Sequence, residues 1–261
     1  MLIKMKLLTD THSHLELFKD DLDEVLENAK KAGFKAVITA GINPETNRKA
    51  LKLAKKYDII QCSLGVYPRS ALKRETKDGE FPLKLEEFDV LKEIDFIKAN
   101  KDNIVAIGEI GLDFVNGRDE GQIEDFKEML KLAEELKKPV IVHSRKAEEE
   151  CIEILESFKL KKVIMHCFCG KKKLVKRIQE NGWYFSIPAI VVRTQQFQEL
   201  VKEVPLSQLF TESDAPYLSP YKDKRNEPAF ITETIKKIAE IKRMDEQEVV
   251  NNIYMNFGRV F

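Results

Sequence analysis

Six potential metal ligands each stand where a short apolar segment of the chain ends. They are His12, His14, Glu109, His143, His166 and Asp214. The four histidines in this set are all the histidines of the protein. Imidazoles and carboxylates are the side chains that bind divalent ions such as zinc and manganese. If the fold brings these segments together, the six groups could bind two divalent ions.

A simpler interpretation competes with this one. Any single histidine among the six, taken alone, is more often a core residue whose ring is hydrogen-bonded. Two carboxylates accompany the histidines, however, and a buried carboxylate is costly unless it is paired or bound to a cation. We therefore expect a metal centre. Asp10, Asp113 and Glu212 could orient ligand imidazoles, or they could cap loops.

The elements that must position these residues are predicted strands rich in Val and Ile. They are Leu7–Leu8, Ala36–Ala40, Ile59–Ser63, Ile104–Ile110, Val140–His143, Val163–His166, Tyr184–Ile187 and Leu209–Thr211. Their nearly continuous hydrophobicity, without strict alternation, is typical of parallel strands that are buried on both faces.

Helical patterns lie between the predicted strands. Residues 20–33 carry one apolar stripe that stops at a glycine. Asn43 followed by Pro44 is typical of a helix start, and residues 122–138 form another amphipathic pattern. Residues from Gly65 to about Leu83 mix proline, glycine and charge, so we expect an elaborated loop there.

This alternation predicts an α/β fold, a (β/α)8 TIM-type barrel, regular or distorted, that forms a single domain over residues 1–261. No glycine-rich dinucleotide loop follows the first strand, which disfavours an open doubly wound sheet. The carboxyl ends of barrel strands meet on one rim, where active sites of this fold lie. The barrel would therefore bring the six ligands together.

Composition narrows the function classes. With 44 basic and 44 acidic side chains the formal charge is zero, which excludes strong general attraction to nucleic acid. No apolar segment reaches the ~20 residues of a membrane-spanning helix, and the first six residues show no export signal. We expect a cytoplasmic protein that does not associate with a membrane and does not require a protein partner. Its four cysteines form no CxxC pair and should be free thiols.

Four segments resemble the signatures of the TatD-type metal-dependent deoxyribonucleases, a branch of the amidohydrolase-like barrels. They are Asp10–Leu15, Gly108–Asp113, His166–Gly170 and Glu212–Leu218, and the resemblance extends to residues 225–228. It implies a ligand set as well. His12, His14 and Asp214 would hold one ion, His143 and His166 would hold the other, and Glu109 would bridge the two.

The resemblance also implies hydrolysis of DNA or an oligonucleotide, in an exonuclease-like manner, by a water that two metal ions activate. Glu109 and Asp214 would then be catalytic, because Glu109 sets the spacing of the ions and Asp214 accepts the proton of the attacking water. The family is usually described as using magnesium, whereas imidazole ligands favour ions such as manganese or zinc. The ion is therefore Mg, Mn or Zn.

One loop departs from the family pattern. Residues 65–69 read Gly-Val-Tyr-Pro-Arg where such proteins commonly have Gly-Val-His-Pro-His. Neither replaced histidine belongs to the ligand set, but the loop borders the substrate, so the preferred substrate stays open. Arg69 could still bind a phosphate. Arg225 is another candidate for substrate binding, because Lys and Arg outnumber Asp and Glu in the predicted rim connections.

Two other functions remain open. The same ions could hydrolyse an amide, lactone or phosphotriester, since one barrel rim supports many reactions. Barrels with those activities often carry a modified lysine at the end of the fourth strand, where this chain has Glu109, and this difference favours the nuclease. Alternatively, the metals could serve folding alone, although structural zinc normally has four protein ligands and no open position.

Overall fold

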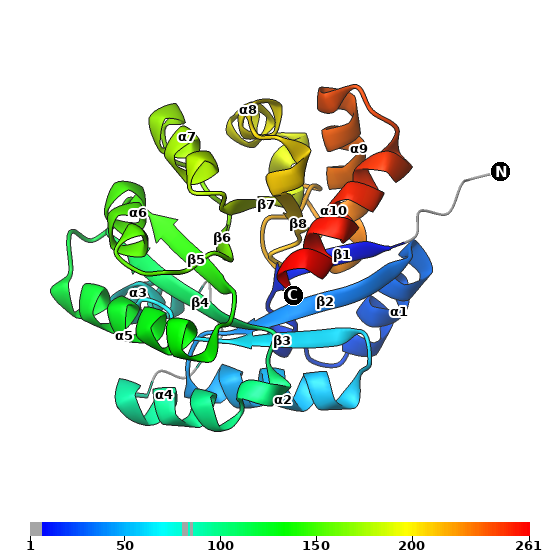
Figure 1. Cartoon of the computed structure of the whole chain (residues 1–261). Coiled ribbons are helices and arrows are strands. Elements are labelled where there is room, and N and C mark those ends of the chain that lie inside the picture. The colour runs from blue at the N-terminus through cyan, green and yellow to red at the C-terminus, as the bar shows by residue number, and fades with distance from the viewer. Residues whose placement is uncertain (1–6, 80–82, 84–85) are drawn as a thin grey trace.

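The computed structural model describes residues 7–79, 83 and 86–261, so the amino-terminal segment judged above for an export signal lies outside the described residues. Eight parallel strands form one sheet whose order follows the sequence (Figure 1). The strands are β1 (Leu8–Ser13), β2 (Phe34–Gly41), β3 (Ile60–Leu64), β4 (Ala106–Asp113), β5 (Val140–Arg145), β6 (Val163–Met165), β7 (Tyr184–Pro188) and β8 (Leu209–Glu212).

Helices surround the strands (Figure 1). They are α1 (Leu22–Ala32), α2 (Pro44–Lys56), α3 (Arg69–Lys77), α4 (Val90–Ala99), α5 (Glu120–Leu136), α6 (Glu148–Glu156), α7 (Lys172–Glu180), α8 (Gln195–Glu203), α9 (Ile231–Lys242) and α10 (Glu246–Val260). The predicted signals at two ends are confirmed. Gly33 ends α1 with a φ of 105°, a conformation that glycine adopts without steric cost, and Asn43 begins α2 with a capping box.

The sheet curls into a nearly closed barrel, which confirms the predicted α/β barrel. Across the seam between β8 and β1, the hydroxyl of Thr211 donates to the carbonyl of Thr9 at 2.9 Å, and the hydroxyl of Thr11 donates to the carbonyl of Thr211 at 3.1 Å. Just beyond β8, the amide of Asp214 donates to the carbonyl of His12 at 2.9 Å. The seam is where the barrel departs from a regular ladder.

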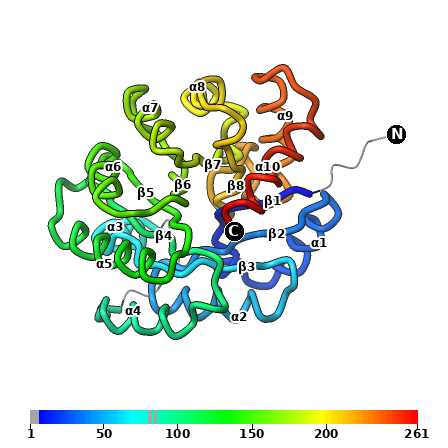
Figure 2. The backbone as a smooth tube through the Cα atoms, viewed as in Figure 1, coloured from blue at the N-terminus to red at the C-terminus, as the bar shows by residue number. Residues whose placement is uncertain are grey.

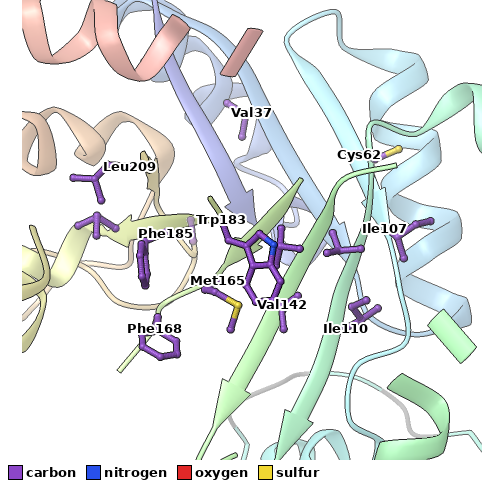
Figure 3. Close-up of a cluster of buried hydrophobic side chains, with 14 of the residues drawn as sticks. Val37, Cys62, Ile107, Ile110, Val142, Met165, Phe168, Trp183, Phe185 and Leu209 are labelled. Carbon is purple, nitrogen blue, oxygen red and sulfur yellow. The ribbon is translucent and has the colours of Figure 1, made fainter. Parts of the chain in front are cut away.

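The core has two layers because alternate strand residues face opposite sides. Val37 and Ile107 belong to the outer layer, which packs against the helices (Figure 3). Ile38 and Ile141 belong to a separate inner cluster that includes Phe257 of α10. Helix α10 crosses this end of the barrel (Figure 2). Apolar side chains thus fill the interior near the amino ends of the strands, and the polar ligands lie toward the carboxyl ends.

Two predicted boundaries are wrong. The first strand is not Leu7–Leu8 but continues to Ser13, so His12 lies inside β1. Glu109 lies within β4 and not at its end. Both strands carry polar residues that are fully buried on the inside of the barrel. Hydrophobic periodicity cannot detect a strand whose inward face is polar.

The expected loop over residues 65–83 is also wrong in part, because it contains helix α3. Residues 80–82 of this interval lie outside the described residues. Only Ala71 and Leu72 give α3 a buried apolar face, which is too little for a clear helical pattern. All four cysteines are free, as predicted. Within the described range, no helix combines the length and apolarity needed to cross a bilayer.

Candidate metal centre

The six predicted ligands converge inside the carboxyl end of the barrel. They supply three overlapping groups whose donor atoms all lie within 4.8 Å of one another. The groups are His12, His14 and Glu109; His12, His166 and Asp214; and Glu109, His143 and His166. Strands β1, β4 and β5, together with residues just beyond β1, β6 and β8, thus contribute to a single cluster, as the barrel interpretation required.

Glu109 lies between two sets of imidazoles. Its Oε2 is 3.4 Å from Nε2 of His12 and 3.7 Å from Nε2 of His14. Its Oε1 is 3.2 Å from Nδ1 of His143 and 3.9 Å from Nε2 of His166. Each carboxylate oxygen therefore faces a different pair of nitrogens, which is the geometry of a ligand shared by two ions.

Asp214 completes the first of these sets. Its Oδ1 is 3.6 Å from Nε2 of His12 and 3.7 Å from Nε2 of His14. The side chain of Asp214 is 13% exposed, whereas that of Glu109 is 3% exposed. Asp214 is consequently the carboxylate of the cluster that is more accessible from the pocket.

An irregularity in β4 turns Glu109 toward the barrel axis. Ile107 and Ile110 both pack in the outer layer, although residues three apart in a regular strand face opposite sides. The register between β4 and β5 shifts between these two residues, and such shifts re-aim side chains. Gly65 of the neighbouring loop fits closely here, since a Cβ at that position would lie 2.3 Å from the carbonyl oxygen of Glu109.

Buried carboxylates orient two of the imidazoles. Nδ1 of His166 lies 2.7 Å from Oε2 of Glu212, as the prediction for Glu212 required. Nδ1 of His14 lies 3.3 Å from Oε1 of Glu16, a partner that the sequence interpretation missed. In both rings Nε2 then points to the cluster. The carboxylate of Asp10 accepts instead from the backbone amide of His12 and from Ser213.

His143 is held from its other side. Its Nε2 is 3.5 Å from Oδ2 of Asp113 and 3.4 Å from the hydroxyl of Tyr67. Asp113 in turn accepts two hydrogen bonds from Arg74, at 3.0 and 2.9 Å. Arg74 was missed because it belongs to the segment expected to be a loop. The sequence feature that could have identified this helix is the spacing of Ala71, Leu72 and Glu75, which places the three residues on one face of α3.

The electrostatics of the cluster favour metal ligation. Burial lowers the pKa of His12 to about 4, and His166 contributes to this shift, so His12 is a neutral donor at neutral pH. Burial alone would raise the pKa of Glu109, but His12, His143 and His166 hold it well below its usual range. Burial raises the pKa of Asp214 to about 6, against the opposing effect of His166 and His14. Metal ligands must be deprotonated, and these groups meet that condition.

The residues fit a pair of divalent ions. Both ring nitrogens of His12 are buried and find no hydrogen-bond partner among the described residues, although Nε2 faces two carboxylates. A buried polar atom without a partner is costly, and a bound cation would relieve that cost. Two ligands bound to one ion by bonds of about 2.1 Å at a tetrahedral angle lie ~3.4 Å apart. The 3.2 to 3.9 Å separations around Glu109 match that spacing.

Metal uptake should release protons at neutral pH. Burial opposes charge on His14 and His166, but Glu16 raises the pKa of His14 to about 9 and Glu212 raises that of His166 to about 10. Both rings are therefore charged at pH 7 without metal, and each must lose one proton from Nε2 to bind an ion. Burial also opposes charge on His143, but Asp113 and Glu109 raise its pKa as well, so we expect release of at least two protons per chain at pH 7 and tighter metal binding as the pH rises toward 9.

Calorimetric titration of metal-free protein with Zn²⁺ or Mn²⁺, in buffers of different ionisation enthalpy, measures this release. Heats that do not depend on the buffer, or an affinity that stays constant between pH 6 and pH 9, would contradict it.

Glu212→Gln should weaken metal binding by about 10- to 100-fold, because the variant loses the charge that orients and polarises His166. The same change at Glu93, a buried carboxylate that accepts from Arg48 at 2.7 Å outside the cluster, serves as the matched control. A competition titration with a metal-binding dye measures both affinities. Equal affinities in Glu212→Gln and wild type would show that the ring needs no charged partner.

A pocket of about 780 Å³ opens above the cluster. Its walls include Tyr67, Glu75, Arg145, Lys146 and Tyr217 in addition to metal-ligand candidates. The two predicted substrate-binding residues are not among those that line it. Nε of Arg69 donates to Asp125 at 2.7 Å, and Arg225 pairs with Asp21 and covers the ring of Phe18.

Comparison with known proteins agrees with this geometry. The family model described as TatD related DNase matches residues 9–261. Deoxyribonuclease TATDN3 of Homo sapiens is 35% identical over 264 residues, which cover 97% of this chain and 94% of that protein. The 3'-5' ssDNA/RNA exonuclease TatD of Erwinia tasmaniensis is 32% identical over 258 residues, which cover 94% of this chain and 95% of the relative.

A solved structure has the same fold. The crystal structure of YjjV, a TatD homolog from Escherichia coli K12, superposes with a TM-score of 0.84 at 25% identity and covers 97% of both chains. The family match, the relatives and the buried His, Glu and Asp cluster lead to one conclusion. This chain belongs to the TatD-related DNase family of metal-dependent hydrolases.

Proposed function

We propose that this chain is an exonuclease that hydrolyses phosphodiester bonds of DNA with the aid of two divalent metal ions. The observation that carries the proposal is the position of Glu109, whose two oxygens face two separate sets of donors. The names of the human relative, a deoxyribonuclease, and of the Erwinia relative, an exonuclease, support the choice of substrate. The ions are Mg, Mn or Zn.

Each of the two ions would have its own ligands, and one residue would be shared. His12, His14 and Asp214 would hold one ion, His143 and His166 would hold the second, and Glu109 would give one oxygen to each. When bound, such a pair of ions lowers the pKa of the attacking water and neutralises the charge that develops on the phosphate. Glu212, Glu16 and Asp113 keep the three rings oriented through the hydrogen bonds described above.

Asp214 is the residue that we assign to proton transfer. Only its Oδ1 faces His12 and His14, and its side chain is the more exposed of the two carboxylates in the cluster. Asp214 also borders the pocket, where an attacking water would enter. Its carboxylate would take the proton of that water as the new bond to phosphorus forms and the bond from phosphorus to the departing sugar oxygen breaks, and that oxygen would leave with a proton from Asp214 or from solvent. Arg145 and Lys146, in the pocket wall, supply positive charge for the phosphates.

The test is cleavage of end-labelled single- and double-stranded oligonucleotides by protein loaded with each of the three metals. We expect stepwise shortening from one end, and loss of cleavage when a chelator removes the metal. Parallel assays with amide, lactone and phosphotriester substrates separate the alternative. Turnover of one of these by a metal-loaded protein that is inert toward DNA would overturn the proposal.

A further inference from the structure

Glu75 places a buried carboxylate in the wall of the pocket, and none of the roles assigned above uses it. The residue is 3% exposed. Its Oε1 accepts a hydrogen bond from Arg74 at 2.7 Å and lies 3.4 Å from both the hydroxyl of Tyr67 and Nη1 of Arg145. Within the described part of the chain, its Oε2 has no hydrogen-bond partner.

The unpartnered oxygen is expensive to keep in this place. Arg74 is shared by two carboxylates, because the same guanidinium donates to Glu75 and to Asp113. It therefore does not fully neutralise the charge of Glu75. A buried acceptor without a donor loses its hydration and gains nothing in return. A residue of this kind at a pocket wall is explained if a ligand supplies the missing donor.

The surroundings indicate which donor fits. A carboxylate repels the phosphates of a nucleic acid but accepts strongly from a neutral hydroxyl group. Arg145, whose side chain is 53% exposed, stands beside Glu75 and can bind a phosphate. The hydroxyl of Tyr67 is 3.4 Å from both Glu75 and His143, so this corner adjoins the metal centre. The part of a strand that directly follows the scissile phosphate is a sugar.

We infer that Oε2 of Glu75 accepts a hydrogen bond from the terminal sugar hydroxyl of the DNA strand. The inference rests on the proposed nuclease function and deepens it, since it makes the enzyme recognise a chain end. A strand without that hydroxyl, or one that continues through the site, leaves the buried carboxylate unsatisfied. Sites built around a hydrogen bond discriminate strongly against substrates that lack the partner.

The test compares kcat/KM of the metal-loaded enzyme on oligonucleotides with a 3′-hydroxyl or 3′-hydrogen, and with a 5′-hydroxyl or 5′-hydrogen. For wild type, we expect one of the two replacements to lower kcat/KM by about 10- to 100-fold, the range for a hydrogen bond to a charged group. In Glu75→Gln, Arg74 should keep the amide oxygen, which leaves an NH2 group where Oε2 was. The variant should lose a similar factor on the hydroxyl substrate and no longer discriminate between the termini.

Glu93→Gln is the matched control, because it changes another buried carboxylate paired with an arginine, away from the pocket. It should keep the wild-type ratio. Equal wild-type rates on all four termini, or a wild-type ratio in Glu75→Gln, would overturn the inference and leave the nuclease function standing. A changed preference among bases with no change among termini would also overturn it. Failure of the metal-loaded wild type to cleave any oligonucleotide would overturn the inference together with the nuclease function.

Discussion

Glu109→Gln is expected to lower kcat/KM for DNA cleavage by at least about 10³-fold and to reduce the metal content below two ions per chain. Both oxygens of Glu109 face imidazole nitrogens within 3.2 to 3.9 Å, so each is placed to bind an ion. Glutamine offers one neutral oxygen, and the loss of several kcal/mol of charge stabilisation corresponds to a factor of this size. Elemental analysis and initial rates on a labelled oligonucleotide measure both effects.

The control for this variant is again Glu93→Gln. Glu93 is as buried as Glu109 and accepts from Arg48 and Asn47, but it lies outside the ligand cluster. It should retain both ions and the wild-type rate. If Glu109→Gln kept two ions and more than a tenth of the wild-type kcat/KM, the shared-ligand role of Glu109 would be wrong.

Asp214→Asn should give the second largest loss, a fall in kcat of about 10²- to 10⁴-fold, because an amide cannot accept the proton of the attacking water. The other five ligands stay in place, so the ion between Glu109, His143 and His166 should remain bound. The KM should change much less than kcat, since Asp214 acts on the water and not on the bulk of the substrate. Steady-state kinetics and elemental analysis on the same preparation separate the two effects.

A fall in metal content that fully explains the lost rate of Asp214→Asn would assign this residue to binding alone. A kcat within about threefold of wild type, with metal retained, would remove it from the reaction. The neighbouring Ser213 is not a useful substitute control, because its hydroxyl holds Asp10 at the barrel seam.

The barrel and the convergence of the six candidate ligands were predictable because each signal is local. In β5, Val140 and Val142 face the helices, whereas Ile141 and His143 face the barrel axis, and the sequence shows this strand as an apolar run that ends at a histidine. Once the strands form a barrel, their carboxyl ends must converge. A short window therefore sufficed to place most of the six side chains at one site.

Other features depend on contacts between distant segments. The direction of Glu109 is set by the shifted register between β4 and β5, which no pattern within β4 reveals. Arg74 and Glu75 reach the pocket from α3, whose apolar face is small. Arg69 and Arg225 were chosen for charge and position, but the ion pairs that draw them to Asp125 and Asp21 depend on how the helices pack.

The most direct measurement is anomalous diffraction from crystals of the metal-loaded protein, combined with cleavage assays on the same preparation before and after chelation. We expect two peaks, one beside His12, His14 and Asp214 and the other beside His143 and His166, with Glu109 between them. Cleavage of DNA should vanish with the metal and return when it is restored. Peaks elsewhere, or undiminished cleavage by protein freed of metal, would contradict a metal-dependent reaction at these six side chains.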